Sequence, residues 1–222
     1  MKYELIIFDM DGTILNTLDD MKDAVNFALK KNGLPERTLD EIKWFVGQGM
    51  QVLIHRAVPD GTSAETETKV REDFLPYYSE HAADKTAPYD GITEAAEQIK
   101  SLGYKIVVNS NKPDKEAGIL AEQYFPGVFD FVLGARDDLQ KKPSPDGVNF
   151  LAEKFVVEKS KVVYIGDSDI DFLTAKNAGV TFIGCDWGFR GKEFLVKQGA
   201  EHIAMKPADL VKLLRDSETS SE

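Results

Sequence analysis

The sequence predicts an α/β protein whose doubly wound parallel sheet is interrupted, after its first strand, by an all-helical insert. Three observations support this prediction. Short apolar runs, typical of strands buried on both faces, recur along most of the chain. Segments of helical periodicity separate these runs, as in the strand–helix–strand crossovers of a parallel sheet. Between the first run and the second, residues 16–84 show helical patterns alone.

The first strand is expected at residues 5–8, a continuous apolar run that ends at an aspartate. The insert is expected to hold four helices: one from Leu18 to the Asn32-Gly33 stop, one beginning at the capping-box sequence 38–41, one over 50–58, and a long one kinked at Pro76. Later strands are expected at 105–109, 131–133, 162–165, 180–183 and 201–204, and helices at about 92–101, 113–123, 144–155 and 168–178, with a final helix before the last strand.

This order of elements divides the chain into two domains. Residues 1–15 and 85–216 are expected to form a Rossmann-like core, and residues 16–84 a helical domain inserted into it. The last residues, 217–222, are polar and include no apolar side chain, so we expect a disordered tail there.

The composition excludes several classes of function. The formal net charge is -11 and no basic cluster offsets it, so nucleic acids and anionic membranes are not expected as partners. A small phosphorylated metabolite is not excluded, because salt screens charges beyond about 8 Å. No apolar run approaches the roughly 20 residues that span a bilayer. The single cysteine and the absence of a signal-peptide pattern favour a cytoplasmic protein. We expect it to be a monomer or a homodimer.

Polar residues follow the ends of four predicted strands. Asp9 and Asp11 come after the first strand, Ser110 after the second, Lys142 after the third and Asp167 after the fourth. In an open parallel sheet the ligand crevice lies at the carboxyl ends of the strands. The pattern therefore predicts a single site that all four segments build.

These segments carry a resemblance to a known family. Residues 8–13, 108–112, 142–145 and 166–171 resemble, in this order, the four motifs of the haloacid dehalogenase superfamily, and the helical insert after the first motif resembles its first type of cap. The stretches 46–49, 88–92 and 175–179 are similar to those of the phosphoglycolate phosphatase-like branch.

The resemblance implies a phosphatase in which Asp9 is the nucleophile and is transiently phosphorylated. It also implies a Mg²⁺ cofactor held by the Asp9 carboxylate, the backbone carbonyl of Asp11, and Asp167. The chemistry agrees: a carboxylate is ionised at pH 7 without an activating base, and Mg²⁺ takes oxygen ligands. Asp11 is expected to be the general acid for the leaving group and then the base for water.

Phosphate binding is assigned to four positions. Gly12 allows the tight turn that points backbone amides at the phosphate. Ser110 and Asn111 are expected to donate to the non-bridging oxygens, and Lys142 to neutralise the transition state. Chemistry alone does not choose between Lys142 and its neighbour Lys141, but the Lys-Pro-x-Pro pattern of the family selects Lys142.

Asp171 lies four positions after Asp167, on the same helical face, and we expect it to orient the lysine or a water at the metal. In the cap, Gln48, Gly49 and Arg56, with Gly47, are the expected selectors of substrate. Arg56 suits either a substrate carboxylate or a surface salt bridge.

Two other functions involve a phosphorylated aspartate of this kind. A phosphosugar mutase of the same fold would pass the phosphoryl group to sugar instead of water, and only cap residues separate the two. A phospho-acceptor domain of the receiver type would place its acceptor at mid-chain, whereas here the aspartate is at position 9. A P-loop kinase is excluded, because the chain has no Gly-x4-Gly-Lys-Ser/Thr segment. The identity of the phosphorylated substrate cannot be predicted from the sequence.

Overall fold

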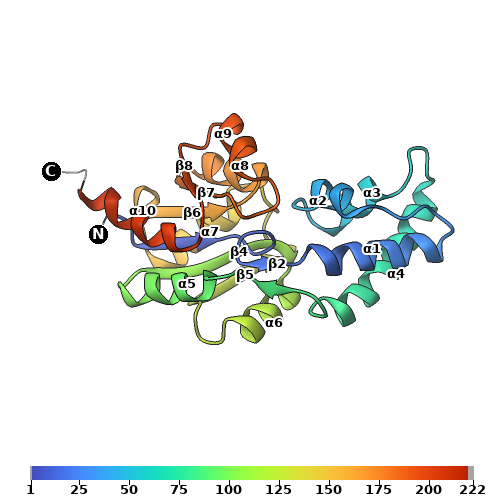
Figure 1. Ribbon diagram of the computed structural model, residues 1–222, viewed down its shortest axis with the longest axis horizontal. Helices are drawn as coiled ribbons and strands as arrows, with labels where there is room; N and C mark the ends of the chain where they lie inside the picture. The colour runs from blue at the N-terminus through green and yellow to red at the C-terminus, as the bar shows by residue number, and fades with distance from the viewer. Residues whose placement is uncertain (1, 220–222) are drawn as a thin grey trace. The chain divides into compact units, whose positions relative to one another are not determined.

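The computed structural model describes residues 2–219, with side chains through residue 215 (Figure 1). The chain forms two compact units. Met1–Leu15 and Pro88–Glu222 make up the first, and Asn16–Ala87 make up the second. Where the chain passes from one unit to the other, β2 (Leu15–Asn16) and β3 (Ala87–Pro88) form a two-stranded sheet.

A six-stranded parallel sheet is the centre of the first unit. Its order is β5-β4-β1-β6-β7-β8, which in chain order of the six strands reads 3-2-1-4-5-6. This is the doubly wound order, and the predicted fold class is confirmed. The order reverses between β1 and β6, and a ligand crevice is expected at that reversal. The strands are β1 (Leu5–Phe8), β4 (Lys105–Pro113), β5 (Phe131–Ala135), β6 (Val162–Gly166), β7 (Thr181–Cys185) and β8 (His202–Ala204).

The register of the central strands aligns the start of the loops. Phe8 at the end of β1 pairs with Val108 of β4 and with Ile165 of β6. All four residues of β1 are buried, because neighbours flank it on both sides and helices cover the sheet. The residues that follow Phe8 and Ile165 therefore leave the sheet at one level, beside the last residues of β4.

Helices cover both faces of this sheet. α5 packs with α10, whereas α7, α8 and α9 pack with one another in sequence, and Figure 1 shows the two groups on opposite sides. The helices are α5 (Ile92–Ser101), α6 (Asp114–Tyr124), α7 (Asp146–Phe155), α8 (Asp169–Ala178), α9 (Lys192–Gln198) and α10 (Ala208–Thr219). Among the described residues, no helix combines the length and the apolar character needed to cross a membrane.

The C-terminal region differs from the prediction. The last element expected from the sequence is the strand at 201–204, but α10 follows it and buries Leu210 and Leu214. Residues 217–219, which were expected to be disordered, belong to α10. A helix that has already begun extends by a few residues at little cost in free energy. The rest of the predicted tail, 220–222, lies outside the described residues.

The second unit is helical. It contains α1 (Leu18–Lys31), α2 (Leu39–Phe45), α3 (Met50–Ala57) and α4 (Ala64–His81). The predicted capping box begins α2: Glu41 N–H donates to the Thr38 hydroxyl at 3.3 Å, and Thr38 N–H donates to the Glu41 carboxylate at 2.8 Å. α4 continues through Pro76. Phe74 and Tyr78 stack with ring centroids 5.3 Å apart and are buried, so aromatic residues of α4 help to form the core of this unit.

Asp20 holds the two ends of the helical unit together. It lies in the first turn of α1 and is buried. Its carboxylate accepts hydrogen bonds from Lys85 N–H at 3.0 Å, from Thr86 N–H at 2.8 Å and from the Thr86 hydroxyl at 2.8 Å. The segment that leaves this unit is therefore bound to the helix that begins it.

Candidate active site

Asp9 is at the centre of the site. It directly follows β1, is buried, and its N–H donates to the Ile165 carbonyl at 2.8 Å, which fixes its backbone to β6. The Lys142 ammonium lies 2.5 Å from Asp9 Oδ1 and 2.7 Å from Asp171 Oδ1. Lys142 is also buried, so one enclosed cation bridges two carboxylates that are 162 positions apart in sequence.

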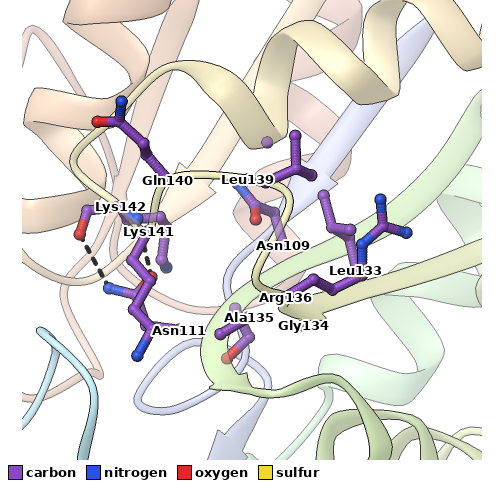
Figure 2. A pocket seen from close by; sticks show the side chains of 12 residues that line it. Asn109, Asn111, Leu133, Gly134, Ala135, Arg136, Leu139, Gln140, Lys141 and Lys142 are labelled. Carbon is purple, nitrogen blue, oxygen red and sulfur yellow. Dashed lines mark hydrogen bonds between the residues drawn. The ribbon is translucent and has the colours of Figure 1, made fainter. Parts of the chain in front are cut away.

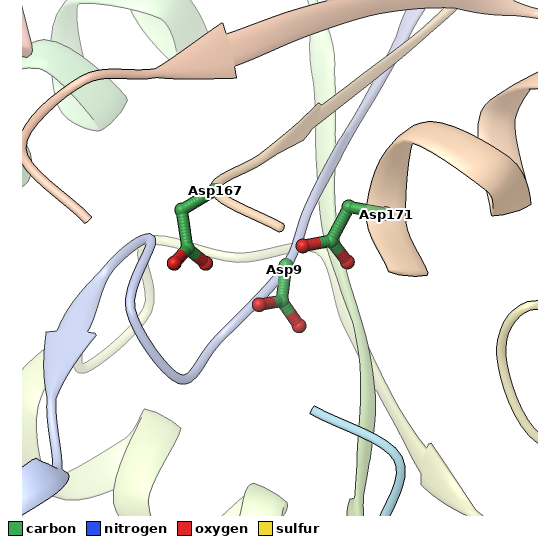
Figure 3. Close-up of side chains that lie close together, drawn as sticks. All are labelled: Asp9, Asp167 and Asp171. Carbon is green, nitrogen blue, oxygen red and sulfur yellow. The ribbon is translucent and has the colours of Figure 1, made fainter. Parts of the chain in front are cut away.

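Three buried carboxylates converge at this point. Asp9, Asp167 and Asp171 each offer an oxygen within 4.8 Å of the others, and Figure 3 shows their carboxyl groups close together and pointing to the same side. Asp167 and Asp171 are almost completely enclosed. Lys142 contacts Asp9 and Asp171, and the charge of Arg190 acts on Asp167, so three carboxylates are crowded around few positive charges.

The pKa shifts follow from this arrangement. Burial, and then the charge of Asp171, raise the pKa of Asp9 well above its usual value, against the opposing pull of Lys142. Burial and Asp171 likewise raise the pKa of Asp167 to about 7. Burial alone would lower the pKa of Lys142, but Asp171 and Asp9 raise it well above the usual value, so this lysine stays charged.

The cluster fits a hard divalent cation. Carboxylate oxygens are the ligands that Mg²⁺ prefers, and it commonly uses one or two of them with a substrate phosphate. A divalent cation would also counteract the burial and the repulsion that raise the pKa values of Asp9 and Asp167, because it favours their ionised forms. Asp171 is placed differently, because its oxygens are engaged: Oδ1 accepts from Lys142, and Oδ2 accepts from Ser168 N–H at 3.1 Å and from its hydroxyl at 2.6 Å. These contacts favour the expected role of orienting Lys142.

The turn after Asp9 requires a glycine. Gly12 has a φ of 95°, and a Cβ there would lie 2.5 Å from Asp167 Oδ2. The next residue, Thr13, donates its hydroxyl to Asp167 Oδ1 at 3.1 Å. The loop after β1 and the loop after β6 are thus in direct contact at Asp167.

Asn111 holds the lysine loop in place. Its side-chain oxygen accepts from Lys142 N–H at 2.8 Å, and its side-chain nitrogen donates to the Lys142 carbonyl at 3.0 Å, both dashed in Figure 2. The cavity beside this pair, which Ser110 and Lys141 also line, has a volume of about 10 Å³. That is about the room for one water. The Asn111 side chain is thus engaged with the backbone, and its expected phosphate contact would fall to its backbone amide.

Lys112 lies at the site, although the sequence pattern gave it no role beyond its place in the segment 108–112. Its ammonium lies 3.1 Å from Asp11 Oδ1, and its side chain is only 2% exposed. Its backbone N–H donates to the Ser110 hydroxyl at 3.1 Å. Lys112 lies within β4 and is buried there, and a lysine so close to the end of the predicted strand was a usable signal, because lysines are almost never buried without a partner.

The loop after β7 is the second omission. Phe189 N–H donates to Asp167 Oδ2 at 2.7 Å, a contact that no side-chain motif could have predicted because a backbone amide makes it.

The expected substrate-selecting residues lie in the helical unit. Gly49 is the N-cap of α3, with a φ of 85°, and Gln48 and Gly47 precede it. Arg56 donates from Nη1 to the carbonyls of Trp44 and Phe45, both at 3.4 Å. Its guanidinium thus lies at the C-terminal end of α2, where a cation stabilises the helix dipole. The role of all four in choosing substrate stays a prediction.

Comparisons with known proteins agree with this geometry. A family model described as haloacid dehalogenase-like hydrolase matches residues 6–185. A phosphoglycolate phosphatase of Vibrio parahaemolyticus is 30% identical, over 95% of this chain and 96% of that protein. A crystal structure from Lactobacillus delbrueckii, described as a candidate phosphoglycolate phosphatase, is 36% identical with a TM-score of 0.90, over 95% of this chain and 97% of that one. A candidate β-phosphoglucomutase structure from Thermotoga maritima, at 24% identity, has a TM-score of 0.69 over 96% of this chain and 99% of that one, which shows the fold alone.

Proposed function

This chain belongs to the haloacid dehalogenase-like hydrolase family, and on that premise we propose that it is a Mg²⁺-dependent phosphatase of small phosphomonoesters that works through a phosphorylated Asp9. One observation carries the proposal most directly. A buried aspartate at the reversal point of the sheet touches a buried lysine and lies within 4.8 Å of two further carboxylates. A nucleophile, a cation for the phosphoryl oxygens and a divalent-metal cluster are thereby combined at one point.

In the first half-reaction an Asp9 oxygen attacks phosphorus. The bond from phosphorus to the ester oxygen breaks, and Asp11 gives its proton to the departing alcohol. Lys142 holds Asp9 in place and offsets negative charge on the transferring group. When bound, Mg²⁺ would be held by Asp9, Asp167 and the Asp11 carbonyl, and it would neutralise phosphate charge and polarise a phosphoryl oxygen.

In the second half-reaction Asp11 removes a proton from water, and that water attacks phosphorus. The bond between phosphorus and Asp9 breaks, inorganic phosphate leaves, and the Asp9 carboxylate is restored. Lys112, 3.1 Å from Asp11, holds this acid and base in position throughout. Asp171 keeps Lys142 in place from the opposite side.

The named relatives support a phosphoglycolate-type substrate, a small molecule with a carboxylate near the phosphoester. The phosphosugar mutase is less supported, since the β-phosphoglucomutase match carries the fold only. We place the enzyme in the cytoplasm, where its single buried cysteine would stay reduced.

The deciding experiment is a screen of phosphomonoesters with Mg²⁺ in ¹⁸O-labelled water. We expect labelled inorganic phosphate from every ester that is turned over, and the largest kcat/KM for a phosphorylated 2-hydroxy acid. If the phosphoryl group instead moves to a second position of a sugar and phosphate carries little label, the enzyme is a mutase and the proposal fails.

A further inference from the structure

The loop that follows β7, residues 186–190, belongs to none of the four motif segments, yet it contacts two of them. Phe189 N–H donates to Asp167 Oδ2 at 2.7 Å, and the Trp187 indole N–H donates to the Thr13 carbonyl at 3.0 Å. Thr13 in turn donates its hydroxyl to Asp167 Oδ1 at 3.1 Å. Both oxygens of Asp167 are therefore held, one by each of two loops that Trp187 binds to each other.

A glycine allows this close approach. A Cβ on Gly188 would lie 2.2 Å from the Asp167 Cβ and 2.5 Å from the Gly12 carbonyl oxygen. Real Cβ atoms do not come so close, so any other residue would push the loop away from Asp167. Because residue 188 has no side chain, the Phe189 N–H comes within hydrogen-bond distance of Asp167.

The base of the loop is anchored at two points. Asp186 N–H donates to the Ala204 carbonyl of β8 at 3.0 Å, and Asp186 Oδ1 accepts from Lys192 N–H, the first residue of α9, at 2.6 Å. The loop is thus fixed to the sheet at its start and to the motif loops at Trp187 and Phe189. Such fixed donors set the rotamer of a carboxylate and leave its remaining lone pairs in a constant direction.

We propose that Trp187 is a positioning residue of the metal site. Its indole hydrogen bond to Thr13 keeps the Thr13 hydroxyl and the Phe189 N–H, which both donate to Asp167, in place, so that Asp167 is oriented for a divalent cation. The inference rests on the proposed function, which supplies the cation. The indole hydrogen bond of Trp187 goes to Thr13 and not to a predicted ligand, so Trp187 acts through Thr13 and Phe189.

The first test measures Mg²⁺ binding by calorimetry on the metal-free protein. Trp187→Phe removes the indole N–H and keeps a flat aromatic ring, and Trp44→Phe, whose side chain is 51% exposed on α2, is the matched control. Outer partners of metal ligands typically change affinity by about 10- to 100-fold, so we expect the Kd of Trp187→Phe to rise about tenfold. Saturating Mg²⁺ should restore most of its turnover, which a merely structural defect would not allow.

A second measurement follows the fluorescence of Trp187 itself. The chain has two tryptophans, so Trp44→Phe leaves Trp187 as the single indole. Its emission should change saturably with Mg²⁺, at the Kd that calorimetry gives, and adding Asp167→Asn should abolish the change. Wild-type affinity in Trp187→Phe, or emission that does not respond while calorimetry shows binding, overturns the inference alone. A wild-type protein that binds no Mg²⁺ overturns the proposed function together with it.

Discussion

The two units of the chain use carboxylates in opposite ways. In the sheet unit Asp9 and Asp167 are buried beside another acid, and burial raises their pKa values. In the helical unit, hydrogen bonds from Thr38 lower the pKa of Glu41, and one from Lys31 lowers that of Asp73. The helical unit thus satisfies each of these charges with a donor, whereas the sheet unit keeps acids together at a cost in stability, as active sites commonly do.

The contrast teaches where function can be read. Charged residues of the site follow buried strands and are held by contacts from distant segments. Burying them together costs stability, and a function explains that cost. Arg56 contacts the last carbonyls of the neighbouring helix α2, and the capping residues of the helical unit contact the helices that they begin, so these contacts explain both without a ligand. The predictions below test this contrast, from the largest expected effect to the smallest.

Asp9→Asn keeps the shape of the nucleophile and removes its charge. Turnover should fall by on the order of 10⁴-fold or more, because loss of a nucleophile removes the covalent route. The fold should remain, since one member of a repelling cluster becomes neutral. Phosphate release and circular dichroism would check both. Residual activity of about a tenth of wild type would contradict the covalent mechanism.

Asp11→Asn should damage both half-reactions, by roughly the 10²–10⁴-fold that general acid–base catalysis contributes. Para-nitrophenyl phosphate has a good leaving group and needs little protonation, so its first step should be impaired less. Phosphoenzyme should then accumulate, and rapid mixing should show a burst of nitrophenol near one equivalent of enzyme. If para-nitrophenyl phosphate and the preferred phosphomonoester are slowed equally and no burst appears, Asp11 only holds the metal.

Lys142→Met is expected to lower kcat by about 10²-fold or more, because Asp9 and Asp171 lose the cation between them. Lys141→Met is the matched control, since Lys141 is the neighbouring lysine and is exposed. It should keep wild-type kinetics. Kinetics of the two variants in parallel would decide between adjacent lysines that chemistry alone could not separate, and equal losses would remove the special role of Lys142.

The sequence alone predicted the fold class and the hydrolase family, and both are confirmed. Both predictions were possible because the ends of strands and the residues of each motif are visible in short stretches of sequence. The structure also brings Asp9, Lys142, Asp167 and Asp171 together, while their assigned roles and the domain boundaries stay predictions.

The omissions have physical reasons. Lys112 was included in the motif segment 108–112 without a role of its own, and only the folded chain shows its ammonium beside Asp11. The loop 186–190 acts through the Phe189 amide and a bond to the Thr13 carbonyl, and backbone contacts leave no side-chain pattern. The helix α10 was missed although Leu210 and Leu214 have helical spacing, so here the sequence held a usable signal.

The stability of the metal-free protein should depend on pH through Asp167. Its pKa is about 7 in the folded chain against a usual 3.8. Between about pH 4 and 7 the unfolded chain has lost this proton and the folded chain retains it, so the free energy of unfolding should fall as pH rises through that window. Urea unfolding at several pH values would measure this slope, and Asp167→Asn should reduce it, leaving the part that comes from the raised pKa of Asp9. Added Mg²⁺, which binds the ionised form, should stabilise the protein more at pH 8 than at pH 5.

Arg56→Ala tests whether a residue of the helical unit only stabilises a helix or also binds substrate. Its guanidinium lies on the last carbonyls of α2, so we expect a small loss of stability, about 0.3–1 kcal/mol, as for a cation at a helix C-terminus. If that is its whole role, kcat/KM should stay within about twofold for every ester, since no substrate contact is lost. If Arg56 instead binds a substrate carboxylate, KM for a phosphorylated 2-hydroxy acid should rise about tenfold or more, while an uncharged alkyl phosphate is unaffected. Steady-state kinetics on both esters, with Gln48→Ala as a second variant of the helical unit, would distinguish these outcomes. A selective rise in KM would mean that a helix-capping contact can conceal a specificity residue, and the contrast between the two units would then hold for catalysis only.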